Sequence, residues 1–430
     1  MTQADEEKKP AALQAAIYAI AFFTGNPFIM LSVIMPLWAL ELGATPLVIG
    51  IIISSRQILV ITMAVHSGAL LDRFGPRMVI ILMGVIGAAV MALFPFFPSV
   101  AVIVLLQMIS GFAETTTWIG TQALVGTLLD GRPVYAGRMT AVARVGGFIG
   151  PWATGLAWQF IGSGAAFWFL SVWVLFGGLS AWFLPQTTVN AITSPSPSPH
   201  APVAPAPAPA PAPVLRPAAV ERRPSVLPSL SDYATTFRLL LLPAVALVIV
   251  VTFVRQTGSG IQSSFYGVWL KQIGYEAGTI GLFLAISNAA SAGTALTIGP
   301  LTRRVSEHWL LVAATILAIA SIAITPLLGG FAILAAAIAL RGVGQGLNFP
   351  LMLAIASRAV GPHLQGRVVA LRITFNRLGG ALVPFVMGAL AEVIGLEAAF
   401  YVMGVVGVVL LGLVGAWISR VPEFNGGSRG

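Results

Sequence analysis

The residues of this sequence that could do chemistry are charged side chains placed inside long apolar stretches. Six arginines lie in such stretches: Arg56, Arg144, Arg255, Arg341, Arg372 and Arg377. One acidic residue, Glu114, lies at comparable depth in another. A guanidinium group keeps its proton and grips carboxylate or phosphate through two parallel hydrogen bonds, so this pattern indicates anion binding. Because a cation in an apolar span costs at least about 2.5–3.5 kcal/mol, each arginine needs a partner, water or an anionic ligand.

Glu114 can neutralise one of these arginines, and we expect Arg144 on the next apolar stretch to be its partner. One or two others could bond helix carbonyls at Gly/Pro breaks, and Arg372 could reach the membrane surface. At least two guanidinium groups should then face a central cavity. The expected substrate-binding residues are Arg144 and Arg377 first, then Arg56, Arg341, Arg255, Asn348 and Tyr266, with Gln345, Asn288 and Trp269 as possible further lining. Since arginine does not release its proton, Glu114 is the candidate for proton coupling.

The composition defines the class of protein. Of 430 residues 57% are hydrophobic and 9% charged, against about 25% charged in soluble domains. Apolar runs of about 20 residues without alternation predict an all-α polytopic membrane protein and exclude a barrel. The chain has no Cys, four scattered His, no paired carboxylates and no Gly-Lys-Ser/Thr phosphate loop. We therefore expect no enzyme, no cofactor and no metal site.

An internal repeat organises the chain. Residues 144–167 read RVGGFIGPWATGLAWQFIGSGAAF, and 233 positions later residues 377–400 read RLGGALVPFVMGALAEVIGLEAAF. Arg144 aligns with Arg377, and Pro151 aligns with Pro384. A repeat of this length predicts two pseudo-symmetric halves, with the substrate site between them near mid-bilayer.

Twelve membrane-spanning helices fit the pattern, six in each half. The expected organisation is an N-terminal segment 1–11, a six-helix bundle 12–185, a Pro/Ala-rich linker 186–235, a second six-helix bundle 236–420 and a tail 421–430. Gly25, Asn26 and Pro27 interrupt the first span, as a proline kink or as an unwound segment lining a cavity; both interpretations remain open. In the seventh span we expect a break at residues 258–260, Gly-Ser-Gly.

The basic residues predict the orientation. Of the 23 Lys and Arg residues, six fall inside the spans, and among the rest only Lys271 falls in a loop on the side opposite the termini. Basic loops stay in the cytoplasm, so both termini and the linker should be cytoplasmic and the protein multi-pass in the cytoplasmic (inner) membrane. The net charge of +9 then reports orientation and needs no nucleic acid.

Two motifs resemble those of a known family. The segment GALLDRFGPR at 68–77 is similar to the signature loop of the major facilitator superfamily, through Gly68, Asp72, Arg73, Gly75 and Arg77. The stretch RVGGFIGPWATG resembles the helix-5 motif of that family's drug/proton antiporter branch, through Gly150 and Pro151, whose repeat equivalent is Pro384. The family's helix-4 arginine is replaced by Gln107. The resemblance implies that these residues act in gating.

The resemblance also implies a function. It predicts the twelve-helix major-facilitator fold and a secondary active transporter that works by alternating access. With the buried arginines it predicts a small or amphipathic organic anion as substrate, moved across the cytoplasmic membrane by proton coupling. A multidrug or lipophilic-compound proton antiporter, a lipid or lysolipid flippase and a non-transporting sensor remain alternatives. The expected partners are the substrate, protons and membrane lipids, with a monomer as the working unit and no nucleic acid.

Overall fold

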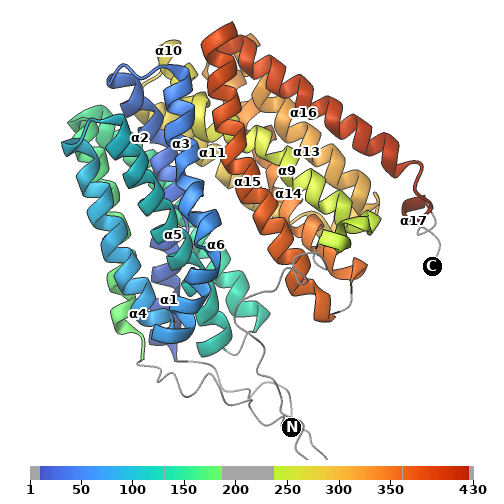
Figure 1. Cartoon of the computed structure of the whole chain (residues 1–430), viewed down its shortest axis with the longest axis horizontal. Coiled ribbons are helices and arrows are strands. Elements are labelled where there is room, and N and C mark those ends of the chain that lie inside the picture. The colour runs from blue at the N-terminus through green and yellow to red at the C-terminus, as the bar shows by residue number, and fades with distance from the viewer. Residues whose placement is uncertain (1–9, 130–131, 186–236, 361, 426–430) are drawn as a thin grey trace, which may run out of the picture.

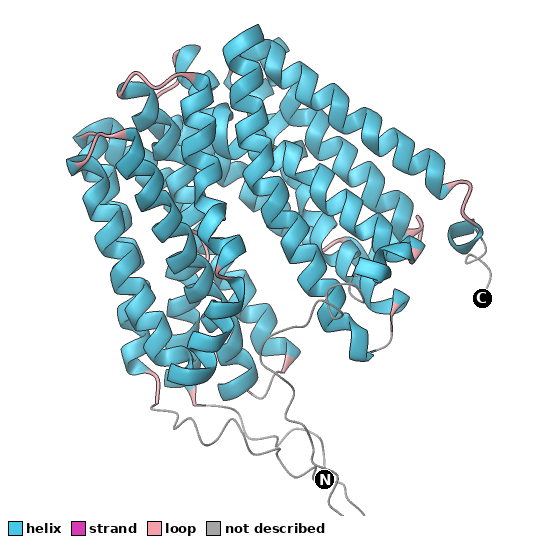
Figure 2. Ribbon diagram, in the orientation of Figure 1, coloured by secondary structure: helices cyan, strands magenta, loops and turns pink. Residues whose placement is uncertain are grey.

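The structure is a computed structural model that describes residues 10–129, 132–185, 237–360 and 362–425. The described part is built of helices and connecting loops, without a strand (Figure 2). The whole linker expected at 186–235 lies outside the described residues. Residues 1–9 of the N-terminal segment and residues 426–430 of the tail lie outside them too.

The first half contains helices at the six expected spans, and the first of these spans is divided into two helices. Its helices are α1 (Ala11–Thr24), α2 (Pro27–Glu41), α3 (Pro46–Thr62), α4 (Ala64–Leu93), α5 (Val100–Leu128), α6 (Pro133–Ile161) and α7 (Ser163–Ser180). Proline opens α2, α3 and α6, where its missing N–H costs nothing. Helix α4 consists of two helices joined at Gly75, whose φ of 74° and ψ of 156° turn the chain. Only glycine adopts this backbone conformation without strain.

The second half repeats this arrangement. Its helices are α9 (Pro243–Ile261), α10 (Gly267–Gln272), α11 (Ala277–Ala295), α12 (Ile298–Thr302), α13 (Glu307–Ala323), α14 (Phe331–Ala359), α15 (Pro362–Ile394), α16 (Leu396–Ile418) and α17 (Pro422–Asn425). The expected break at 258–260 is wrong, because α9 stays helical to Ile261. The irregularity follows it, as a π-helical turn over Gln262–Tyr266 that leads into α10.

Eight helical segments of the described chain are long and apolar enough to cross a membrane. They comprise α1 with α2, α4, α5, α7, α9 with α10, α14, α15 and α16. The shorter apolar helices α3 and α13, together with the less apolar α6 and α11, complete the twelve spans that the sequence predicted. Helices α6 and α11 pack against each other between the halves, so their polar residues need not face lipid.

The two halves meet through two helix pairs, α3 with α15 and α6 with α11. Glycines bring these helices close together. A Cβ atom on Gly50 would lie 2.5 Å from the carbonyl oxygen of Pro384, and one on Gly155 would collide with the carbonyl of Ala277. Small residues at such crossings let two backbones approach, so a larger side chain there would push the halves apart.

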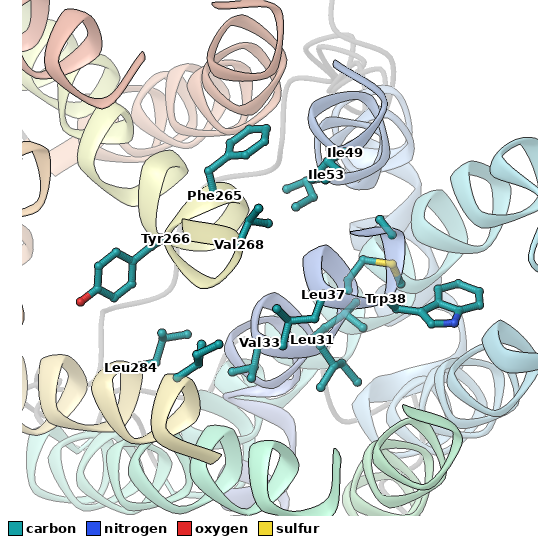
Figure 3. Close-up of a cluster of buried hydrophobic side chains, with 14 of the residues drawn as sticks. Leu31, Val33, Leu37, Trp38, Ile49, Ile53, Phe265, Tyr266, Val268 and Leu284 are labelled. Atoms are coloured by element: carbon teal, nitrogen blue, oxygen red, sulfur yellow. The ribbon is translucent and has the colours of Figure 1, made fainter. Parts of the chain in front are cut away.

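An apolar seal reinforces this contact, and it comprises Val33, Leu37, Ile49, Ile53, Phe265, Val268 and Leu284. Figure 3 shows Phe265 and Val268, from the π-helical turn and α10, facing Ile49 and Ile53 of α3. All seven side chains are buried. The π-helical turn therefore places a large aromatic side chain of one half against the other half.

These contacts lie at one end of the bundles. They involve the start of α3 and α11 and the end of α6 and α15. Figure 1 shows the two bundles, blue to green and yellow to red, leaning apart toward the opposite end, where α1 begins. The halves are thus joined at the end away from the start of α1 and separate at the other.

Candidate functional site

A cavity of about 330 Å³ lies between the halves and adjoins the apolar seal at Ile53. Its walls come from α1, α2, α3 and α5 of one half and from α9, α14 and α15 of the other. The polar part of its lining consists of Thr24, Arg56, Gln57, Glu114, Thr115, Arg255, Gln256, Ser259, Ser263, Gln345, Asn376 and Arg377. The large apolar side chains are Phe28, Ile29, Ile53, Val60 and Trp118.

The first span is broken where it reaches this cavity. Helix α1 ends at Thr24, and α2 begins at Pro27. The N–H of Phe28, the second residue of α2, donates to Oε1 of Glu114 at 3.0 Å. A carboxylate at a helix N-terminus is stabilised by the free N–H groups and by the helix dipole. Of the two interpretations of this segment, the structure has the one with a break that lines the cavity.

Arg56 is the partner of Glu114. The two form an ion pair between α3 and α5, in which the Arg56 side chain is 5% exposed and that of Glu114 is 17% exposed. Nη1 of Arg56 also donates to Ser110 Oγ at 2.7 Å and to Gln107 Oε1 at 3.4 Å. Its Cζ lies 5.5 Å from the centre of the Phe28 ring. The expected pairing of Glu114 with Arg144 is therefore corrected: the α3 arginine reaches the carboxylate.

Two further arginines line the wall from the second half without a carboxylate partner among the described residues. Arg255 donates to the side chains of Gln256 at 3.0 Å and Ser259 at 3.5 Å, and its Nε is buried with no acceptor. Arg377 donates to Oε1 of Gln57, across the gap between the halves, at 3.3 Å. Neutral acceptors leave the positive charges of both groups uncompensated.

Arg341, Tyr266 and Asn348 lie behind this wall, outside the cavity lining. Arg341 is 3% exposed and donates to Ser287 Oγ at 3.0 Å and to the carbonyl of Gly258 at 3.4 Å. Tyr266 stacks on Trp269, and Figure 3 shows it projecting away from the seal. Asn348 accepts a hydrogen bond from Thr315 at 2.9 Å. Buried polar atoms without partners remain on all three side chains.

Arg144, the repeat equivalent of Arg377, is exposed on α6 and is not part of the cavity lining. The two arginines occupy matching places in sequence but different surroundings. Arg377 reaches Gln57 of the other half, whereas no contact of Arg144 with the other half is found among the described residues. Arg372 lies outside the lining too, with its Cζ 5.1 Å from the centre of the Phe349 ring.

An arginine–serine pair occurs in both halves with the two partners exchanged. In the first half Arg56 of α3 donates to Ser110 of α5. In the second half the arginine is Arg341 of α14, and it donates to Ser287 of α11. The pseudo-symmetric helix pairs are thus bridged by the same two residue types in the opposite order.

Matching glycines place these pairs in register. Gly111 packs against the backbone of the α3 arginine, and Gly342 packs against the carbonyl of the α11 serine. Three residues after each glycine stand Glu114 in the first half and Gln345 in the second, and both line the cavity. The first half therefore carries an internal counter-ion where the second half has a neutral amide.

The loop motif lies at the end of the first half where α1 begins. Gly68, Asp72 and Arg73 are exposed, and Gly75 makes the turn inside α4. Arg77 donates to the carbonyl of Trp182, after α7, at 3.0 Å. The contact of Arg77 is therefore made within its own half.

The proline motifs lie at the contact between helices. Gly150 packs against Met30 of α2, and a Cβ on Gly281 would collide with the carbonyl of Pro151. Pro384 occupies the corresponding place against Gly50. Pro151 and Pro384 therefore lie where the halves join, whereas the contact of Gly150 is within its own half.

Several lining residues went unrecognised in the sequence. Phe28, Thr115, Trp118 and Gln256 were not predicted, whereas Gln345 was. A usable signal was present for α5, because Gly111, Glu114, Thr115 and Trp118 are spaced to share one face of a helix. For metals, the described residues contain no group of three or more His, Cys, Asp or Glu that could hold an ion.

Comparisons with known proteins agree with this architecture. A family profile described as Major Facilitator Superfamily matches residues 17–254 and 248–430. "Multidrug resistance protein MdtH" of Yersinia pestis (strain Pestoides F) is 29% identical over 164 residues, which are 36% of this chain and 39% of that protein. The chain thus matches about two fifths of the length of this curated relative.

Solved structures match over nearly the whole chain. The nucleoside transporter NupG superposes with a TM-score of 0.71 at 15% identity, covering 94% of this chain and 98% of NupG. A bacterial homolog of the human lysosomal transporter Spinster, in an inward-facing and unoccupied conformation, gives a TM-score of 0.70 at 14% identity, covering 95% and 96%. At such identities the likeness concerns the fold.

Proposed function

Because the chain belongs to the major facilitator superfamily and is a membrane transporter rather than an enzyme, we propose that it carries a small or amphipathic organic anion by alternating access. The observation that carries this proposal is the charge of the central cavity. Arg56, Arg255 and Arg377 line it, against the carboxylate of Glu114 as the acidic group among the described lining residues. Guanidinium groups without counter-ions inside a membrane protein favour an anionic ligand.

Arg255 and Arg377 are the proposed primary ligands of the anion, since their protein partners are neutral side chains. Arg341 lies behind them, where it donates to the carbonyl of Gly258 on α9, and it adds positive charge to this side. Tyr266 and Asn348 also lie outside the lining, and the proposal gives them no contact with the substrate.

Arg144 enters the proposal through the conformational cycle. It stands seven residues before Pro151 and eleven before Gly155, so it shares with them the α6 face that meets α11. Closure of the halves at the separated end would carry Arg144 toward α11 and the cavity. We infer that it contacts the anion when that end is closed.

The basic residues support an orientation with the separated end toward the cytoplasm. Arg73 and Arg77 flank the kink of α4 at that end, and Arg303 and Arg304 lie in the turn after α12. Lys271 follows the seal at the other end. The protein would then reside in the cytoplasmic membrane with cytoplasmic termini and be open inward in this structure. One chain supplies both walls of the cavity, so the proposed working unit is a monomer within membrane lipid.

Proton coupling is assigned to Glu114. It is an acid of the cavity lining, and it is bound to Arg56 and to the first turn of α2. A proton on its carboxylate would release Arg56 as a further anion ligand. Proton uptake and anion binding would then favour each other at this site.

The first test is a thermal-shift screen of the purified full-length protein with acetate, benzoate and citrate, and with tetraphenylphosphonium as a cation. We expect the anions to raise the melting temperature of the wild type. Arg377→Gln should lower the affinity for the anions at least tenfold, because it removes one of the two uncompensated charges. Arg304→Gln, at an exposed turn of the second half, is the control and should bind like the wild type. Equal anion affinity in the wild type and Arg377→Gln would contradict the proposal.

A second candidate function is export of lipophilic compounds. The similarity to a protein named for multidrug resistance favours it, and in that case the arginines would serve structure alone. Stabilisation by the cation in the same screen, unaffected by Arg377→Gln, would select this candidate over the first.

A further inference from the structure

The two walls of the cavity differ in chemistry. If the proposed function holds, this difference indicates which class of anion the cavity binds. The wall from α9, α14 and α15 presents Arg255, Gln256, Ser259, Gln345, Asn376 and Arg377. The wall from α1, α2, α3 and α5 presents Phe28, Ile29, Ile53, Val60 and Trp118 around the Arg56–Glu114 ion pair. One side of the cavity is cationic and polar. The other, here called the apolar wall, holds the large apolar side chains together with the neutral polar residues Thr24, Gln57 and Thr115.

The exchanged arginine–serine pairs explain why charge collects on one wall. In the first half the carboxylate of Glu114 neutralises the arginine. The equivalent residue in the second half is Gln345, which brings no charge. The described lining on that side therefore holds Arg255 and Arg377 without an acidic side chain.

Two aromatic side chains dominate the apolar wall. Phe28 is the second residue of α2, and the guanidinium of Arg56 lies over its ring, with Cζ 5.5 Å from the ring centre. Trp118 lies against the break in the first span, where a Cβ on Gly25 would lie 3.2 Å from its indole ring. Both side chains are half-buried, so part of each ring faces the cavity.

We propose that Phe28 and Trp118 form a subsite for an aromatic ring of the substrate, whose anionic group binds Arg255 and Arg377 on the opposite wall. Rigid aromatic side chains supply a large contact area with little loss of side-chain freedom, and they pair with other rings in stacked or edge-to-face geometry. The substrate class is an aromatic carboxylate or a similar aromatic anion. It binds with its charge toward the second half of the protein.

The experiment measures dissociation constants of benzoate, cyclohexanecarboxylate and acetate for the purified full-length protein by calorimetry. All three carry one carboxylate, so they differ in the apolar part alone. We expect benzoate to bind at least tenfold more tightly than acetate and more tightly than cyclohexanecarboxylate. Phe28→Leu and Trp118→Leu should each weaken benzoate about tenfold and change acetate less than twofold, because the ring contact is lost and the charge contact is kept.

Matched variants separate the subsite from the anion site. Trp182→Leu replaces a tryptophan that is 65% exposed and lies outside the cavity, so it should leave all three constants unchanged. Trp118→Phe keeps a ring and should retain most of the benzoate affinity. Arg377→Gln should weaken all three carboxylates alike.

The outcomes distinguish the two proposals. One outcome is that the carboxylates bind and depend on Arg377, but benzoate binds no more tightly than the other two, or binds as tightly to both leucine variants as to the wild type. The aromatic subsite is then wrong, while the anion site stands. If no carboxylate binds, or Arg377→Gln has no effect, the proposed function and the subsite both fail.

Discussion

Glu114 connects three parts of the first half through one carboxylate. It accepts the Phe28 N–H of α2, pairs with Arg56 of α3 and belongs to α5. Because the Arg56 side chain is almost fully buried, loss of the carboxylate leaves a buried cation without a counter-charge, which is destabilising. The same loss makes the cavity more positive, so a ligand anion can take its place.

Glu114→Gln tests this exchange. The variant keeps the shape of the side chain and removes its charge, so we expect a lower melting temperature without ligand and anion affinity about tenfold higher. In the wild type, anion affinity should rise as the pH falls, since protonation removes the same charge. In the variant that dependence should be absent. Titrations of benzoate at several pH values measure both effects, and a variant that keeps the pH dependence would assign coupling to another group.

At this scale the sequence predicted the residue types but not the contacts. The buried arginines and Glu114 are visible in sequence because charge is rare in apolar spans. The partner of Glu114 depends on how far α3 and α6 lie from α5, which no spacing along the chain determines. The glycine at 111, which lets α5 meet the backbone of Arg56, decides it in three dimensions.

The break in the first span, between α1 and α2, brings the first turn of α2 to the cavity. Asn26 stands in the break and donates to the carbonyl of Ala143 on α6 at 2.6 Å, while Gly146 and Gly147 make room for it. The break is therefore held open by α6 and presents the first turn of α2 to the cavity. Discontinuous helices of this kind serve as ion and substrate sites in transporters.

The contact of α6 with α11 offers a test of the conformational cycle. In Gly155→Leu the side chain has no room beside Ala277 and Gly278, so we expect the joined end to open and the population to shift toward the opposite state. The sequence contains no Cys, which allows one introduced at Ser259 to report access. Its labelling by a membrane-impermeant maleimide from the side of the α2–α3 connection should increase several-fold.

Gly164→Leu is the control for that experiment, because a Cβ at position 164 meets no neighbouring atom. In this control the cysteine at position 259 should be labelled to the same extent as in the Ser259→Cys protein that has glycine at positions 155 and 164. Equal labelling with leucine at position 155 would contradict the role given to this contact.

Element boundaries were predictable where local signals are strong and failed where packing decides. Prolines at the start of helices and long apolar runs predicted the spans well. The Gly258-Ser259-Gly260 sequence suggested a break, yet the helix continues, because its glycines are used for packing: Gly260 accommodates Val383 of α15. The π-helical turn that follows carries no signal in the sequence that we recognised.

As a whole the molecule combines a symmetric frame with an asymmetric site. The repeat aligns Arg144 with Arg377 and Pro151 with Pro384, and the prolines do occupy matching contacts between the halves. The cavity breaks this symmetry, since Glu114 and its equivalent Gln345 differ in charge. We infer that one half responds to protons and the other binds the anion.

Gln345→Glu tests the asymmetry directly. It places a carboxylate on the cationic wall, one helical turn after Arg341, so we expect about tenfold weaker anion binding and a higher melting temperature without ligand. The wild type, with the isosteric Gln345, is the reference, and calorimetry with benzoate gives the dissociation constants of both proteins. Unchanged anion affinity would show that charge on this wall does not select the substrate.

The sequence predicted the whole-molecule organisation better than the site. Twelve spans and two related halves follow from hydrophobicity and the repeat, and the family comparison agrees with both. The repeat also suggested that Arg144 and Arg377 would meet in one cavity, but sequence symmetry does not include the inclination of the halves. In the structure Arg377 belongs to the lining and Arg144 does not.

One connection between the halves is made by the peptide backbone. The Leu47 N–H, at the start of α3, donates to Oε2 of Glu392 at the end of α15 with a distance of 3.1 Å. Any residue except proline at position 47 supplies the same donor, so mutation there leaves the bond intact while mutation of Glu392 removes it. Across homologues, positions 47 and 392 should therefore show no covariation although they touch, and contact maps inferred from coevolution should miss this link.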